Sequence, residues 1–255
     1  MNSALESLGL STPSSDDVPS MVRDVFPSQP PELVRETLIV AHFDLKRIKE
    51  LVGARPSLAR AAWDWGFGDW ETALGAASHT GNKPIAEYLI SQGARPSLFS
   101  AAMLGQLDVV KAFVAAQPQV ERIRGPHGIS LLAHARAGGE AARPVFEFLK
   151  TLGDADADPL VPLSESDVTA VVGTYTFGPT SVTNQQIDVT ADKGQLLWTR
   201  RGSTGRTLYH LGDRVFHPAG APAVRISFVD DKAGMVMTVR DPDLVLTARK
   251  VGGRL

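Results

Sequence analysis

Hydrophobic positions follow two different periods along the chain, and the period changes near residue 155. Between residues 30 and 153, Ala and Leu are frequent and apolar residues recur at helical spacing, as in segment 85–89 (IAEYL). Between residues 165 and 250, short runs of alternating apolar and polar residues are separated by Gly, Asp and Lys. A period of about 3.6 residues predicts amphipathic helices, and a period of about two predicts strands. The pattern therefore predicts an α+β protein in two domains, with the helical domain first.

Polar segments mark the expected domain boundaries. Residues 1–30 are expected to form a polar lead-in and cap before a helical repeat domain over 31–153. Residues 154–163 begin with DADADP, and small, acidic and Pro residues are typical of exposed linkers. The alternating pattern then predicts an antiparallel β-barrel domain over 164–255.

The helical half repeats a unit made of a short helix, a Gly turn and a second amphipathic helix. Gly81 corresponds to Gly105 at an offset of 24 residues, and Gly105 corresponds to Gly138 at an offset of 33. One helix pair cannot bury its apolar face alone, so the units are expected to stack on one another. The positions expected to form the core of this array are Leu74, Ala77, Leu89, Ala102, Val110, Phe113, Leu132 and Ala135.

Segments 72–77 (TALGAA) and 130–135 (SLLAHA) resemble the Thr-Pro-Leu-His-x-Ala pattern of the ankyrin repeat, although Gly75 and Ala133 replace its usual His. The resemblance covers roughly residues 38–153, about four units with a degenerate first one. It implies an ankyrin-like array in which hairpin fingers project at the edge of a concave face. Arrays of this family bind many partners, so the resemblance predicts a fold rather than one function.

The second half predicts a short helix over 164–171, which opens with a Ser-x-x-Asp capping pattern, followed by a series of strands. Tight turns are expected where Gly, Asp and Lys cluster, as in 192–194. About eight short strands joined by such turns favour a meander closed into a barrel, because closure removes exposed edges. The strands are predicted at 172–178, 182–191, 195–200, 205–210, 214–217, 223–230, 234–240 and 243–250.

Three short segments, 172–175 (VGTY), 194–197 (GQLL) and 213–216 (DRVF), are similar to a lipocalin-like accessory domain. That domain occurs at the C-terminus of some serine hydrolases of the β-lactamase type. The half that precedes it in this chain is not such a hydrolase, and the chain has no Gly-x-Ser-x-Gly motif and no phosphate-binding Gly-rich loop. Serine-hydrolase and nucleotide-dependent chemistry are therefore not predicted.

Composition narrows the function classes further. Lys and Arg total 26 against 28 for Asp and Glu, so neither nucleic acid nor an anionic membrane is expected as the main partner, because both bind basic surfaces. The chain has no Cys, which excludes disulfides, thiolate catalysis and Cys-ligated metals. We find neither an apolar run of about 18 residues nor a signal-peptide pattern, and these absences predict a cytoplasmic location.

Three of the four tryptophans fall within segment 63–71 (WDWGFGDWE), here called the tryptophan finger, together with three carboxylates. The ankyrin resemblance places it in a hairpin before the first helix of a unit. One interpretation is that the indoles pack the finger onto its neighbours, as large aromatic side chains commonly do. The other is an aromatic and acidic platform for a ligand.

Segment 124–128 (RGPHG), here called the histidine finger, is the corresponding part of the last unit. Its two glycines and proline predict a tight turn around His127. This histidine either caps the next helix or is solvated, or else it serves as an acid, a base or a ligand contact.

The spacing predicts a notch between the two fingers. The unit between them is 33 − 24 = 9 residues short, and the deficit falls between Gly93 and Leu98, where its own finger is expected. A missing finger leaves a depression with a floor near residues 95–99, and small-molecule sites form in such concave places.

Three functions remain open at this stage. The first is a binding module that recognises a protein or an apolar small molecule on the concave face of the array. The second is a cofactor-independent enzyme in the notch (an isomerase, cyclase, hydratase or hydrolase) that uses carboxylates whose pKa is raised by neighbouring indoles. The third is passive binding of a small apolar ligand inside the barrel.

Neither a metal nor another cofactor is expected, because no two histidines have the i, i+4 spacing of a helical metal site. The residues expected to act as acid or base are Asp64, Asp69, Glu71 and His127, and those expected to contact a ligand are Trp63, Trp65, Phe67, Trp70, His79, Arg95, Phe99 and Met103.

Overall fold

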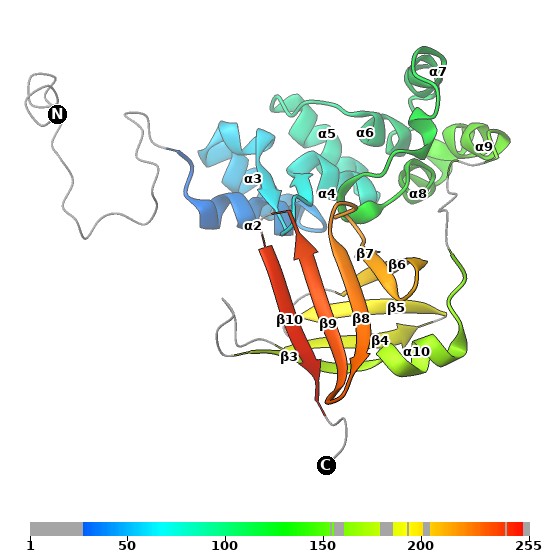
Figure 1. Ribbon diagram of the computed structural model, residues 1–255. Coiled ribbons are helices and arrows are strands. Elements are labelled where there is room, and N and C mark those ends of the chain that lie inside the picture. The colour runs from blue at the N-terminus through cyan, green and yellow to red at the C-terminus, as the bar shows by residue number, and fades with distance from the viewer. Residues whose placement is uncertain are drawn as a thin grey trace, which may run out of the picture.

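The computed structural model describes residues 28–153, 155, 161–178, 186–192, 194–200, 205–242 and 244–251. The helices form an array in the first part of the chain, and the strands of the second part close into a barrel that lies below the array in Figure 1. The predicted α+β fold is therefore confirmed. Most of the predicted lead-in (1–30) and of the predicted linker (154–163) lies outside the described residues.

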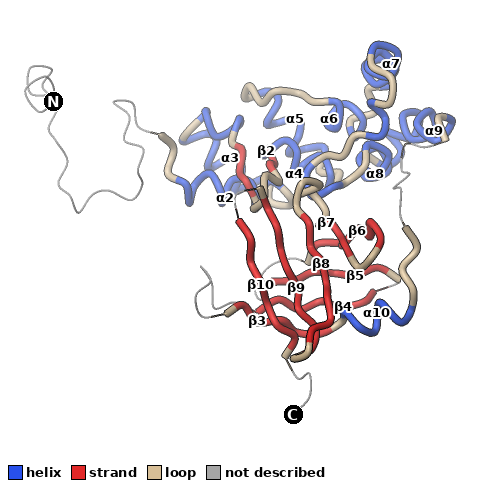
Figure 2. The backbone as a smooth tube through the Cα atoms, viewed as in Figure 1, coloured by secondary structure: helices blue, strands red, loops and turns tan. Residues whose placement is uncertain are grey.

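The array consists of helix pairs joined by short turns. The first helices of successive pairs pack on one another, α2 on α4, α4 on α6 and α6 on α8 (Figure 2). The pairs are α2 (Pro31–Ala41) with α3 (Leu45–Ala54), α4 (Ala73–His79) with α5 (Lys83–Ser91), α6 (Leu98–Met103) with α7 (Leu107–Ala116), and α8 (Leu131–Ala137) with α9 (Arg143–Thr151). Short 3-10 turns lie at η2 (Pro56–Arg60), η3 (Val120–Arg122), η4 (Pro126–Gly128) and η5 (Gly139–Ala142).

Equivalent residues begin and end the helices of successive pairs. The side chains of Thr72, Ser97 and Ser130 each accept a hydrogen bond from the backbone N–H three residues later, the usual N-cap arrangement. Gly81 and Gly105 follow the first helices with φ of 71° and 76°, a region that favours glycine. A Cβ at either position would collide with a backbone carbonyl of the η5 region or α8, so the glycines let neighbouring pairs approach.

The expected array core is observed with one correction. Leu74, Ala77, Leu89, Ala102, Val110, Leu132 and Ala135 are buried. Phe113 is 46% exposed, because Val114 packs beside Val110 one helical turn along α7 and takes the inward position.

The two fingers are present and the third is absent. In the tryptophan finger, β1 (Ala62–Asp64) pairs with β2 (Trp70–Thr72). The histidine finger is closed by a bridge between Arg124 and Ser130 and contains η4. Residues 92–97 are all described, and there the chain passes from α5 to α6 without a strand. The nine-residue deficit therefore does correspond to a missing finger.

The barrel is a meander in which each strand pairs antiparallel with its sequence neighbours, and β10 closes on β3. α10 (Glu165–Val171) is capped by Ser164, and Tyr175, Phe216 and Phe228 fill the interior with edge-to-face ring contacts. The strands match the predicted ones, apart from positions 182–185 and 243, which lie outside the described residues. They are β3 (Gly173–Phe177), β4 (Gln186–Asp192), β5 (Gln195–Arg200), β6 (Arg206–Gly212), β7 (Val215–Pro218), β8 (Arg225–Asp231), β9 (Gly234–Asp241) and β10 (Leu244–Lys250).

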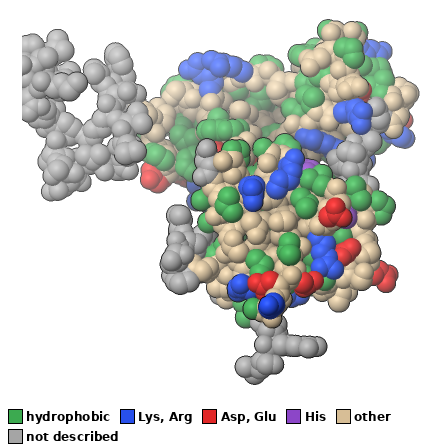
Figure 3. All heavy atoms as spheres, viewed as in Figure 1, with side chains coloured by type: hydrophobic (Ala, Val, Ile, Leu, Met, Phe, Trp, Pro, Cys, Tyr) green, Lys and Arg blue, Asp and Glu red, His purple; other side chains and the backbone are tan. Residues whose placement is uncertain are grey.

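The tryptophan finger connects the array to the barrel. Phe67 at its tip lies against Trp198 of β5, with ring centroids 6.3 Å apart, and packs on the barrel core. Basic and acidic side chains are both present over the barrel on the face seen in Figure 3. Within the described residues, no helix is both long enough and apolar enough to cross a bilayer.

Candidate metal centre

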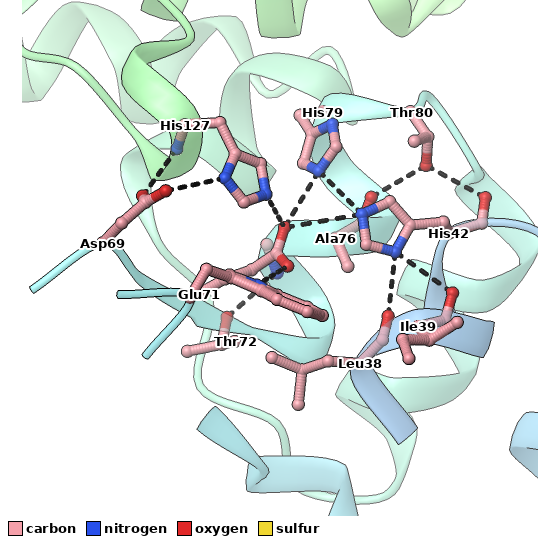
Figure 4. A network of polar contacts seen from close by, with 12 residues as sticks. Leu38, Ile39, His42, Asp69, Glu71, Thr72, Ala76, His79, Thr80 and His127 are labelled. Carbon is pink, nitrogen blue, oxygen red and sulfur yellow. Dashed lines mark hydrogen bonds and ion pairs between the residues drawn. The ribbon is translucent and has the colours of Figure 1, made fainter. Parts of the chain in front are cut away.

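Four side chains from four separate segments converge on one point, and we call them the histidine–glutamate cluster: His42, Glu71, His79 and His127. Each offers one nitrogen or oxygen atom, and these atoms all lie within 4.8 Å of one another. Figure 4 shows the Glu71 carboxylate surrounded by the three imidazole rings.

Local structure explains why these side chains meet. Side chains alternate along β2, so Trp70 is 63% exposed whereas Glu71 points inward and is buried. His79 is the last residue of α4 and His42 directly follows α2, so the packing of these helices brings the two rings to a centroid distance of 4.9 Å. His127 has a φ of 59°, a left-handed conformation that few residues other than Gly adopt.

The distances within the cluster suit a bound cation. Glu71 Oε1 lies 2.9 Å from His79 Nε2, 3.4 Å from His127 Nε2 and 3.7 Å from His42 Nε2. The Nε2 atoms of His42 and His79 are 3.1 Å apart. An ion about 2.1 Å from its ligands holds neighbouring ligand atoms about 3.0 Å apart at 90° and about 3.4 Å apart at the tetrahedral angle.

Outer partners orient the two imidazoles that come from α2 and the histidine finger. His42 Nδ1 donates to the carbonyl oxygen of Leu38 at 2.8 Å, and His127 Nδ1 donates to Asp69 Oδ2 at 2.9 Å. An imidazole that carries its proton on Nδ1 presents a lone pair at Nε2, the atom that faces the cluster. Hydrogen bonds of this kind fix metal-ligating histidines in known centres.

The carboxylate is oriented in the same way. Trp65 Nε1 donates to Glu71 Oε2 at 2.7 Å, which leaves Oε1 toward the three histidines. Three of the four members of the cluster therefore have an outer hydrogen-bond partner that aims a ligand atom inward.

The charges correct one expectation from the sequence. Neighbouring indoles were expected to raise the pKa of the finger carboxylates. Burial does raise the pKa of Glu71, but hydrogen bonds from His127 and His79 outweigh it and bring the pKa to about 2. The pKa of Asp69 is likewise lowered, because hydrogen bonds from His127 and the charge of Arg206 outweigh burial. Both groups are carboxylates at neutral pH, suited to binding a cation rather than to donating a proton.

The pKa of His127 is raised, whereas the pKa values of the two carboxyl groups are lowered. Burial lowers it, but the hydrogen bonds to Asp69 and Glu71 raise it to about 9. Without a cation, this imidazole is therefore protonated at neutral pH, and together with Arg206 it balances the charges of the two carboxylates.

The structure brings five of the predicted site residues together: Asp69, Glu71, His79, His127 and Trp65, whose ring centroid is 6.3 Å from that of His127. The two fingers therefore do meet.

Other predicted residues lie elsewhere. Asp64 accepts hydrogen bonds from the N–H groups of Gly66 and Gly68 and so holds the finger turn. Phe67 contacts the barrel, and Trp70 faces outward.

Three further residues expected to contact a ligand, Arg95, Phe99 and Met103, are not members of the cluster. Arg95 is exposed after α5, Phe99 packs on the ring of His134, and Met103 is buried in the array core. Trp63 borders a surface depression of about 300 Å³ along α2, with Pro31, Glu32, Arg35, Glu36 and Ile39.

Sequence reasoning missed His42 and Arg206. The i, i+4 spacing applies to two histidines on one helix, whereas His42 and His79 lie at the ends of the first helices of successive pairs and meet because the pairs stack. The same position in adjacent repeats was the available signal. Arg206 lies on a barrel strand, and no pattern in the sequence relates it to the fingers.

Comparison with family models, with curated proteins and with solved structures finds no match to the chain.

Proposed function

We propose that this protein is a metalloenzyme, which binds one transition-metal ion in the histidine–glutamate cluster and acts on a small molecule there. The observation that carries the proposal is the convergence of three imidazole nitrogens and one carboxylate oxygen within 4.8 Å, with outer partners on His42, Glu71 and His127. The sequence predicted, as one alternative, an enzyme without a cofactor. The present proposal keeps the enzyme and adds a bound metal ion.

A metal-free ion-pair cluster is the competing explanation. His79 fits it poorly, because its single Nε2 proton would be shared between His42 Nε2 at 3.1 Å and Glu71 Oε1 at 2.9 Å. His42 Nε2 has a lone pair to offer, since the proton of His42 is on Nδ1 and is directed at Leu38. A cation would use the lone pairs of all three atoms at once.

The ligand types restrict the ion. Imidazole with one carboxylate suits Zn²⁺, Fe²⁺ or Ni²⁺ better than the ions that prefer thiolates or an all-oxygen shell. The side chains of His127 and His42 are 33% and 24% exposed, so solvent reaches one side of the cluster. An ion held there would leave that side open to water or substrate.

An ion in this position supplies a Lewis acid that polarises a bound oxygen or lowers the pKa of bound water. Asp69 keeps His127 aimed inward, and Trp65 restricts Glu71 to one ligating oxygen. The reaction class that follows is hydration or hydrolysis of a small molecule. The depression along α2 supports a substrate with an apolar part, since Ile39 and Trp63 border it and His42 comes three residues after Ile39.

We also infer that the array is of the ankyrin type and that the barrel is lipocalin-like. Stacked helix pairs, equivalent caps at Thr72, Ser97 and Ser130 and the hairpin before α4 support the first inference. The closed antiparallel meander of β3 to β10 supports the second.

Metal analysis tests the proposed function. The full chain is treated with EDTA, desalted and titrated with Zn²⁺, Fe²⁺ and Ni²⁺, and bound metal is counted by mass spectrometry. We expect one ion per chain, and at least a 100-fold weaker affinity for Glu71→Gln and His42→Gln. His217→Gln, on strand β7 outside the cluster, is the matched control and is expected to bind like the wild type.

Hydrolysis of p-nitrophenyl acetate by the Zn²⁺-loaded protein probes water activation. We expect the rate to fall to the background level with EDTA and in Glu71→Gln. A wild-type protein that binds none of the three ions contradicts the proposal and favours the binding module. Stoichiometric binding without metal-dependent hydrolysis contradicts the hydrolytic reaction class and retains the metal centre.

A further inference from the structure

Asp69 links the cluster to the barrel. Its Oδ1 accepts the backbone N–H of His127 at 2.8 Å, and its Oδ2 accepts His127 Nδ1 at 2.9 Å. The same Oδ2 lies 3.2 Å from Nη2 of Arg206, which begins strand β6 of the barrel. The Asp69 carboxylate is buried, so this is not a solvent-screened surface pair.

Arg206 is itself held between the two parts of the molecule. Its Nη2 also donates to the carbonyl oxygens of Trp65 and Gly66, at 3.1 and 3.3 Å. Its Nη1 donates to the carbonyl oxygen of Ala219 at 3.3 Å. The planar guanidinium makes these contacts in a fixed fork that an ammonium group cannot reproduce. One side chain of the barrel therefore joins the backbone of the tryptophan finger to the carboxylate that orients His127.

Two glycines bring the barrel close to this carboxylate. Gly220 has a φ of 79°, and a Cβ on it would lie 2.5 Å from the Asp69 carboxyl carbon. A Cβ on Gly128, next to His127, would lie 3.0 Å from the backbone nitrogen of Gly220. The loop at 219–220 thus covers Asp69 and keeps water from it, which strengthens its hydrogen bonds.

We propose that Arg206 is a positioning residue for the metal centre: through Asp69 it holds His127 in its ligating orientation, so that the docked barrel is part of the metal site. This inference rests on the proposed function. It assigns the barrel a role in the centre although no barrel residue belongs to the histidine–glutamate cluster. Loss of an outer partner of a ligating histidine typically weakens metal binding by about 10–100-fold.

The test compares metal affinity in the full-length wild type, Arg206→Gln and Arg206→Lys, using competition titrations with Zn²⁺ and Co²⁺. We expect about 10–100-fold weaker binding in Arg206→Gln and partial recovery in Arg206→Lys, which restores the charge without the fork. The Co²⁺ absorption spectrum, which reports ligand geometry, is expected to change in Arg206→Gln.

The matched control is Arg214→Gln. Arg214 pairs with Asp167 and Asp230 within the barrel half, so its loss is expected to affect stability without changing metal affinity or the Co²⁺ spectrum. The double variant Arg206→Gln/Asp69→Asn tests whether Arg206 acts through Asp69. If it does, the double variant loses no more metal affinity than Asp69→Asn alone.

The outcomes separate the two proposals. A wild type that binds no ion overturns both. A wild type that binds an ion, with Arg206→Gln within twofold of it, overturns the role of Arg206 alone. Additive losses in the double variant overturn the route through Asp69. If Arg206→Gln does not fold, the affinity and Co²⁺ spectrum of Arg206→Lys decide, since wild-type values there contradict the proposal.

Discussion

The barrel interior is filled by aromatic and aliphatic side chains such as Tyr175, Phe216 and Phe228, whereas the array buries charged groups such as Asp69 and Glu71. Among the described residues of the barrel, His210 is the only buried residue of the polar or charged type. The array adds a series of buried polar residues: Thr37, Ser78, Ser100, Glu121, Ser130 and His134. Buried charges are costly unless they are paired.

The difference assigns separate physical roles to the two regions. The array holds the Asp69 and Glu71 carboxylates at the end that meets the barrel, where histidines and Arg206 neutralise them. The barrel covers that end with the loop around Gly220 and anchors Phe67 against Trp198.

The largest effect is expected from a substitution that buries a charge in the array without a partner, because a buried charge is costly unless it is paired. Ala102, on α6, is fully buried within a cluster of apolar side chains. Ala102→Asp is expected to lower the free energy of unfolding by at least about 4 kcal/mol, measured by urea denaturation. Ala115→Asp, at an exposed position of α7, is the control and is expected to change it by less than about 1 kcal/mol. Equal stabilities would show that Ala102 is misplaced in the core.

A cavity in the barrel tests the other side of the comparison. Phe216 is fully buried and contacts the rings of His210 and Phe228. Phe216→Ala is expected to cost about 3–5 kcal/mol, and Val229→Ala, an exposed change on β8, well under 1 kcal/mol. A cost for Phe216→Ala similar to that of Val229→Ala would contradict a tightly packed barrel interior.

Within the array, loss of one outer hydrogen bond is expected to act on metal binding more than on folding. Trp65→Phe keeps an aromatic ring but removes the N–H that holds Glu71 Oε2. We expect about tenfold weaker metal binding and a loss of about 1 kcal/mol in stability, from a competition titration and from denaturation of the metal-free protein. Trp70→Phe, which changes an exposed ring, serves as control. A pure stability loss in Trp65→Phe, with unchanged affinity, would mean that Trp65 only packs the finger.

The smallest effect is expected at the turn of the tryptophan finger. Asp64 accepts hydrogen bonds from the N–H groups of Gly66 and Gly68 and does not reach the cluster. Asp64→Asn retains an acceptor and is expected to be close to the wild type, whereas Asp64→Ala is expected to cost about 1 kcal/mol. A large loss of metal binding in Asp64→Asn would return this residue to the site predicted for it.

The position of the candidate site could be predicted in part. The missing finger and the unusual residues of the two remaining fingers located Asp69, Glu71 and His127 on facing segments, and the structure brings them together. The pKa values of Asp69 and Glu71 are lowered, not raised as expected, because they depend on histidines from other segments and, for Asp69, also on Arg206. A local sequence window contains the indoles but not those cations.

The sequence by itself determined that one part of this protein is a helical array and the other a set of strands, since the period of apolar residues sets which face of each helix or strand is buried. It also determined the repeat units, the absent finger and the strands of the barrel, which depend on caps, turns and alternation within a few residues. Only the tertiary structure decided that His42 joins His79, because that contact arises when successive helix pairs stack. It likewise decided that Arg206 meets Asp69, since a pairing between residues far apart in the chain depends on how the barrel docks and leaves no local pattern.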